Sequence, residues 1–166
     1  MALGQLYVIA CGIFAATLLT GDALGELHEA TPAGFRAAQL ARLALVVTAT
    51  ALGGALLLVP LSWDGAWPSG AELTTLLAGQ IGAVLFVCLI AFCVAATSGS
   101  TQAAVLAALS AWFFLTVLWD ANAGTGLALR RGIPLAGALL ATAWASRRLG
   151  NAERTVEIAL RAEAER

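Results

Sequence analysis

Four long apolar runs constrain the fold of this chain more than any other feature of its sequence. They are Leu6–Thr20, Leu40–Leu61, Leu73–Thr97 and Ala103–Trp119, and Arg42 is the only charged residue within them. A run of about 20 apolar residues is long enough to cross the ~30 Å hydrocarbon core of a bilayer as an α-helix. The sequence therefore predicts an all-α fold, a polytopic membrane helical bundle.

The overall composition leads to the same class of protein. The 166 residues are 60% hydrophobic and 11% charged, whereas soluble domains are roughly 45–50% apolar and about 25% charged. The net charge of −1 offers no basic face for nucleic acid. All nine cations are arginines, in a chain rich in alanine, which suggests a GC-rich prokaryotic genome. We expect the partners to be the lipid bilayer and other membrane chains or copies of this one, with no nucleic acid.

A fifth apolar segment decides the number of spans. Gly132–Ala145 lies between two pairs of arginines, and by itself it is too short for the hydrocarbon core. If this segment only dips into the bilayer, four helices span; if the preceding residues lengthen it, five do. The distribution of arginines does not choose between these topologies, because each places the same majority of the arginines on the cytoplasmic side.

The loop after the second run favours five spans. Residues 62–72 carry Asp64 and Glu72, no cation, and two tryptophans, Trp63 and Trp67, a composition typical of an extracytoplasmic interface. Only five spans place this loop outside while the arginine-rich end stays cytoplasmic. We predict spans over 4–21, 38–61, 73–97, 102–120 and 126–146 in the cell membrane, with the N-terminus outside. Residues 147–166 are predicted to form a short polar cytoplasmic C-terminal helix capped by Asn151.

One cluster of ionisable residues follows the first run and is a candidate cation or proton site. Asp22, Glu26 and Glu29 would share one face of a continued helix, and His28 lies among them. The alternative is a solvated loop ended by a proline. One histidine cannot supply both axial ligands of a haem, and no zinc motif occurs, so we predict no metal and no cofactor. The three cysteines are interpreted as small buried hydrophobes.

Polar side chains inside the runs form a second candidate site, a polar path. Gln80 is the most deeply set of them, and Thr48 and Thr50 of the preceding run are its candidate neighbours. The turn Thr97–Gln102 adds further hydroxyls, those of Thr97, Ser98, Ser100 and Thr101. The alternative is packing: amides and hydroxyls bond between membrane helices, and small residues such as those in Ala78–Gly82 and Gly53–Gly54 allow close approach. A tight helical hairpin is then expected at Gly99.

A third candidate is an interfacial ion pair. Asp120 closes the fourth run, and Arg130 and Arg131 follow after a short loop. Charges at the edge of a membrane segment are often functional, although a simple structural ion pair is the alternative.

The chain has no nucleophile elbow, phosphate loop or HExxH motif, so an enzyme is not expected. The first hypothesis is a non-catalytic integral membrane subunit that packs within a larger assembly. The alternative is a small homo-oligomeric channel or transporter with a polar path lined by Gln80 and the Thr97–Gln102 turn. A membrane enzyme or redox anchor that uses His28 has the least support.

Overall fold

The computed structural model describes residues 2–20, 34–61, 70–122 and 126–148. Within these ranges nearly every residue is helical and no strand occurs, so the predicted all-helical fold is confirmed. The elements are α1 (Ala2–Thr20), α3 (Gly34–Leu61), α4 (Gly70–Ser98), α5 (Thr101–Phe113), η1 (Phe114–Trp119), α6 (Asp120–Asn122), η2 (Ala128–Gly132) and α7 (Ile133–Arg148). The candidate site residues Asp22, Glu26, His28 and Glu29, and the predicted tail helix beyond Arg148, lie outside the described residues.

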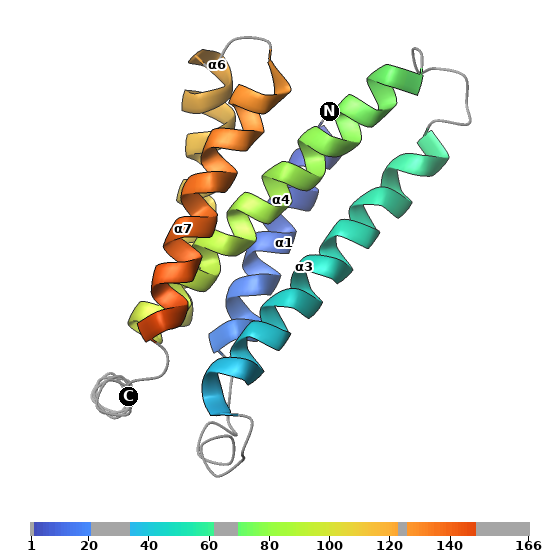
Figure 1. Cartoon of the computed structure of the whole chain (residues 1–166). Coiled ribbons are helices and arrows are strands. Elements are labelled where there is room, and N and C mark those ends of the chain that lie inside the picture. The colour runs from blue at the N-terminus through green and yellow to red at the C-terminus, as the bar shows by residue number, and fades with distance from the viewer. Residues whose placement is uncertain (1, 21–33, 62–69, 123–125, 149–166) are drawn as a thin grey trace.

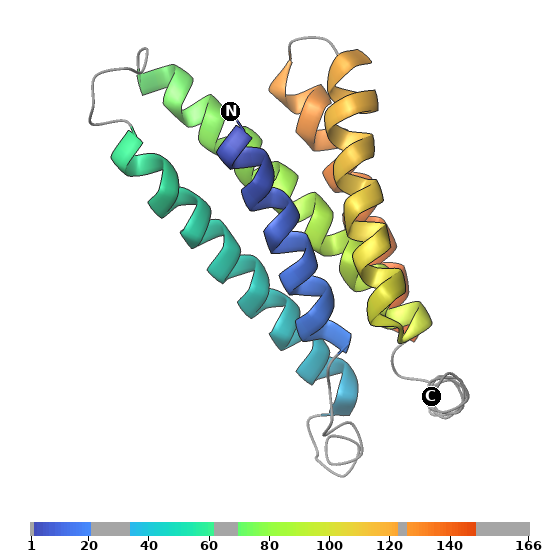
Figure 2. The same cartoon turned by 180° about the vertical axis from the view of Figure 1, so that it is seen from behind.

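Helix α4 is the centre of the bundle. Its direction is opposite to those of α3 and α5, and it contacts α1, α3, α5 and α7 (Figures 1 and 2). Within an 18-residue apolar part of α4, 56% of the residues are buried, against 22% in the corresponding part of α3. The other helices are therefore arranged around α4, and each has an outward face.

The core lies where α1, α4 and α5 meet, and small side chains make it tight. Ala15, Ala16, Ala91 and Ala104 are fully buried there. Alanine and glycine allow helix backbones to approach closely in a membrane, where packing rather than the hydrophobic effect holds helices together. Larger side chains such as Phe92 fill the spaces between them.

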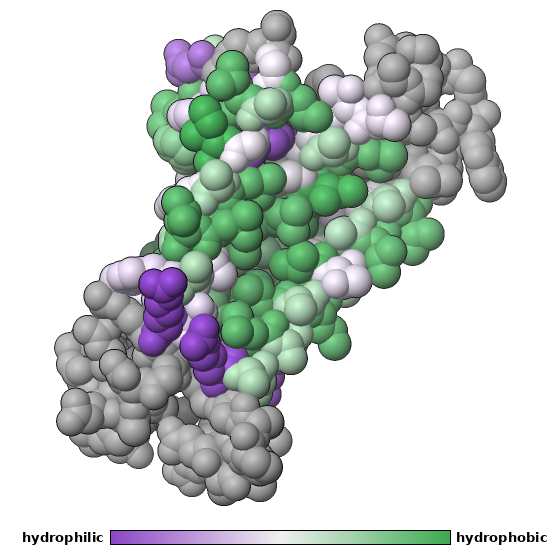
Figure 3. All heavy atoms as spheres, viewed as in Figure 1, coloured by the Kyte–Doolittle hydropathy of each residue, from purple (hydrophilic) through white to green (hydrophobic). Residues whose placement is uncertain are grey.

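Three helices of the described residues are long and apolar enough to cross a membrane. They are Arg36–Leu57 in α3, Thr74–Ser98 in α4 and Thr101–Asn122, which runs through α5, η1 and α6. Helix α1 adds a shorter apolar stretch, Gly4–Thr20. Large apolar side chains project outward, with Leu56 72% and Leu140 73% exposed. Figure 3 shows the apolar surface along the length of the bundle, with strongly hydrophilic residues toward its ends. These features are compatible with membrane insertion.

Candidate functional site

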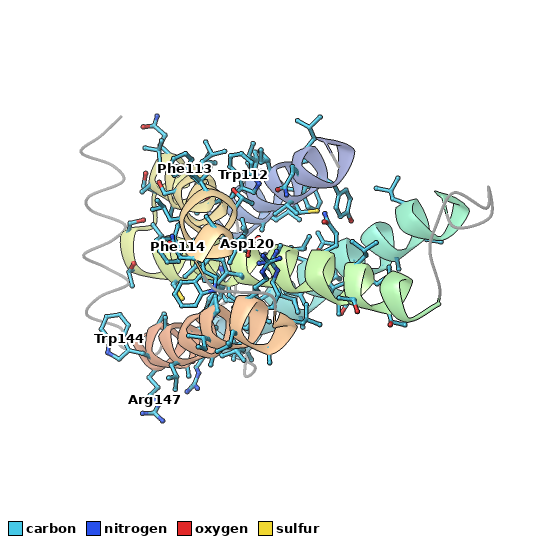
Figure 4. The ribbon with its side chains drawn as sticks, turned by 90° about the horizontal axis from the view of Figure 1, so that it is seen from above. Trp112, Phe113, Phe114, Asp120, Trp144 and Arg147 are labelled. Atoms are coloured by element: carbon cyan, nitrogen blue, oxygen red, sulfur yellow. The ribbon has the colours of Figure 1, made fainter. Side chains whose placement is uncertain are left out.

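Asp120 and Arg131 form a partly buried ion pair between α6 and η2. The guanidinium binds the carboxylate in a bidentate manner, with Nη1 to Oδ1 at 2.5 Å and Nη2 to Oδ2 at 2.9 Å. The two side chains are only 17% (Arg131) and 22% (Asp120) exposed. Viewed down the bundle, Asp120 lies inward, over α4, whereas Trp144 and Arg147 point away from the other helices (Figure 4). This pair joins the end of one helix to the start of the next.

A π-helical turn, η1, directs Asp120 inward. The Asp120 backbone N–H donates to the carbonyl of Leu115, five residues earlier. In a regular α-helix a residue five positions on would lie about 140° around the axis, away from the fully buried Leu115. The wider turn brings it back toward the buried side. Within this stretch Thr116 Oγ1 donates to the carbonyl of Trp112 at 2.8 Å.

A second π-helical turn, η2, contains Arg130 and Arg131, and Pro134 accounts for it. Proline has no N–H, and its ring crowds the carbonyl four residues earlier, which here belongs to Arg130. That carbonyl instead accepts a long hydrogen bond of 3.4 Å from Arg131 Nη1. Such local π adjustments are one way in which membrane helices tolerate proline.

Arg131 also contacts α4, the central helix of the bundle. Its Nε donates to the carbonyl of Gly79 on α4 at 3.0 Å. Its aliphatic carbons lie on Gly82, where an added Cβ would come within 3.2 Å of them. Arg130 bonds to the backbone of the same acidic residue, with Nη2 3.3 Å from the Asp120 carbonyl. The pair is thus a three-way junction of α4, α6 and η2.

The candidate polar-path residues Gln80, Thr48 and Thr50 make separate contacts within the described bundle. Gln80 Nε2 donates to the carbonyl of Gly4 on α1 at 2.6 Å. Thr50 is buried, and its carbonyl accepts the hydroxyl of Tyr7 at 2.5 Å. Thr48 is exposed, and its hydroxyl donates to Ala44 of its own helix at 2.8 Å. Sequence reasoning missed Tyr7, which lies against Gly53 and Gly54 of α3; the glycine pair was the available signal.

The hydroxyls of the Thr97–Gln102 turn lie at and beyond the C-terminal end of α4, whereas Gln80 is in its N-terminal half. The turn is a tight helical hairpin: Gly99 has φ 66° and its N–H bonds to the carbonyl of Ala95 at 2.9 Å. Thr97 and Ser98 donate back into α4, Ser100 caps α5, and Thr101 is 2.6 Å from Thr20 of α1. These hydroxyls therefore satisfy helix ends and a neighbouring helix.

The cysteines lie within the bundle and are free thiols. Cys11 and Cys88 are buried in the core, and Cys93 Sγ is 3.4 Å from the hydroxyl of Thr142 on α7. In the part of the chain that the structure describes, no three histidine, cysteine, aspartate or glutamate side chains are grouped to hold a metal ion.

Comparison with protein-family models, curated proteins and solved structures gives no significant match for this chain.

Proposed function

We propose that this protein is a non-catalytic integral membrane subunit that packs within a larger membrane assembly. The observation that supports the proposal most is that polar side chains inside the bundle form hydrogen bonds between helices. Gln80, Tyr7 and Arg131 each donate to the backbone of another helix, and Trp112 of α5 donates to Gln5 of α1 at 2.8 Å. Groups engaged in this way hold helices together rather than serve a passing solute.

The outward faces support the same proposal. The large apolar side chains exposed on α3 and α7 are mostly leucines, including Leu45, Leu52, Leu139 and Leu140. Membrane lipid or the apolar helices of another chain would cover them equally well. A transport role has less support, because Gln80 and the hydroxyls of the Thr97–Gln102 turn are engaged in hydrogen bonds within or between the described helices.

We further propose five spans, with the N-terminus outside and the C-terminus cytoplasmic. Elements η2 and α7, of 5 and 16 residues, are joined end to end and together reach about 31 Å, the thickness of the hydrocarbon core. Arg36 and Arg147 lie at the end that would be cytoplasmic, as the positive-inside rule requires. At the other end the charge of Arg131 is balanced by Asp120.

The orientation is tested by cysteine labelling in intact cells. Asn122 and Gln102 are exposed at opposite ends of the helix from Thr101 to Asn122. We expect a membrane-impermeant maleimide added from outside to label Asn122→Cys and to leave Gln102→Cys unlabelled until the cells are lysed. The unmodified chain, with its three native cysteines, is the control. The reverse pattern would overturn the orientation.

The packing role of Gln80 is tested by stability and flux together. Removing one hydrogen bond between membrane helices costs about 0.6 kcal/mol on average, so we expect Gln80→Ala to lower the free energy of unfolding in detergent by roughly that amount. Thr48→Ala, at an exposed hydroxyl bonded within α3, is the matched control and should change little. Purified protein in liposomes should carry no ion or solute flux above that of empty liposomes. Flux that Gln80→Ala alters would favour the transporter instead.

A further inference from the structure

A groove lies between the described parts of α1 and α3. Its volume is about 430 Å³, and it is lined by Leu18 of α1 and by Ala41, Arg42 and Leu45 of α3. Leu18 is 41% exposed and Leu45 67% exposed. Among the described residues, the groove thus has apolar side chains from both helices together with the guanidinium of Arg42.

The groove lies at the depth where hydrocarbon meets headgroups. The part of α3 that follows Arg42, up to Leu61, is about 28 Å long at 1.5 Å per residue. That length matches the ~30 Å hydrocarbon core, so Arg42 is placed at its boundary. Leu18 is close to Thr20, where α1 ends. This end of α1 and the start of α3 lie at the same end of the bundle in Figures 1 and 2.

The described charges at this end are of one sign. Arg36 and Arg147 are exposed there, and Arg42 is partly exposed. The acidic residues between α1 and α3 lie outside the described residues. Arg42 already makes an interaction within the chain, but a guanidinium has five N–H donors and can hold that partner and a phosphate oxygen together. Basic pockets between membrane helices on the cytoplasmic side are typical sites for anionic lipid headgroups.

We infer that the α1–α3 groove binds one anionic phospholipid, with an acyl chain along Leu18, Ala41 and Leu45 and the phosphate on Arg42. A zwitterionic lipid would fill the same walls but would bring no net charge to the arginine. The inference rests on the proposed insertion in a membrane and is independent of the subunit role.

The experiment uses the full chain in nanodiscs of phosphatidylcholine with a minor fraction of phosphatidylglycerol. Native mass spectrometry of protein released from them counts the retained lipids of each kind. We expect retention of one phosphatidylglycerol in preference to phosphatidylcholine. One arginine near a membrane surface contributes about 1 kcal/mol toward an anionic lipid, so Arg42→Gln should reduce the preference about fivefold. Arg42→Lys should retain most of it, and Arg147→Gln, outside the groove, should leave it unchanged.

A second variant tests the apolar walls without touching the charge. Ala41→Trp fills the groove at an exposed position and should abolish the retained lipid, while free glycerol phosphate should not compete for it. Equal losses with Arg42→Gln and Arg147→Gln, an unchanged preference in Arg42→Gln, or an unaffected Ala41→Trp would each overturn the inference. If the Arg42→Gln protein unfolds and the Ala41→Trp protein still retains its lipid, the inference is also overturned. Failure of the protein to enter nanodiscs at all would instead contradict the proposed membrane insertion.

Discussion

Replacing Arg131 by glutamine is expected to lower the free energy of unfolding by about 2–3 kcal/mol. Removing one partner of a fully buried ion pair costs about 3–5 kcal/mol, because the other charge stays buried without compensation. The cost here is smaller because the two side chains are 17% and 22% exposed. The bond from Arg131 to the Gly79 carbonyl is lost as well. Unfolding of the purified protein in mixed micelles, followed by circular dichroism, measures the change.

A double variant tests whether the loss of stability comes from the Asp120–Arg131 pair itself. Asp120→Asn alone should destabilise the protein to a similar degree, and Asp120→Asn with Arg131→Gln should cost no more than either change alone, because the two residues act as one unit. Arg147→Gln, an exposed arginine at the other end of the bundle, is the matched control and should stay within about 0.5 kcal/mol of the parent chain. Additive losses in the double variant would show that the pair is not the source of the effect.

Adding one methyl group at Gly12 is expected to disturb the core where α1, α4 and α5 meet. A Cβ at this position would lie 2.5 Å from Val87 Cγ1 and 3.1 Å from the Cβ of Ala108. Val87 is fully buried, and a β-branched side chain in a helix has few alternative rotamers. Overpacking of this kind costs about 1–3 kcal/mol, so we expect Gly12→Ala to lower the stability in that range, measured in the same micelles.

A second substitution at Val87 tests for rescue of the Gly12→Ala protein, and Gly137 provides the control. Val87→Ala in the Gly12→Ala chain should recover part of the loss, because it removes the nearest atom. Gly137→Ala on α7 has nothing within 4 Å of the added Cβ and should be neutral or slightly stabilising, since alanine favours helix more than glycine does. A Gly12→Ala chain as stable as the parent would mean that α1 and α4 pack less closely than described.

The helical character of the chain follows from its apolar runs, but the pairing of its polar groups does not. Three of the runs lie in helices long enough to cross a bilayer, and that length is visible in the sequence. The partner of Gln80 is a carbonyl 76 positions away, which depends on how α1 is set against α4. Packing of small side chains decides that register, and no local pattern encodes it.

The Asp120–Arg131 pair could be predicted only in part from the sequence. The proximity of these charges along the chain suggests a pair, but a regular helix would turn Asp120 away from the core. Pro134 is the residue that favours the second of the two π-helical turns. The acidic residues around His28 are outside the described residues, so their role stays a prediction, as do the five spans and the polar tail helix.

The subunit proposal is tested most directly by the mass of the assembly that contains this chain. The protein, tagged and expressed at its native level, would be extracted from its own membranes in a mild detergent and measured by native mass spectrometry. We expect a mass that requires at least one unrelated chain in fixed ratio to the 16.9 kDa protein. A mass equal to this chain alone, or to a whole multiple of it in every mild detergent tried, would contradict the proposal.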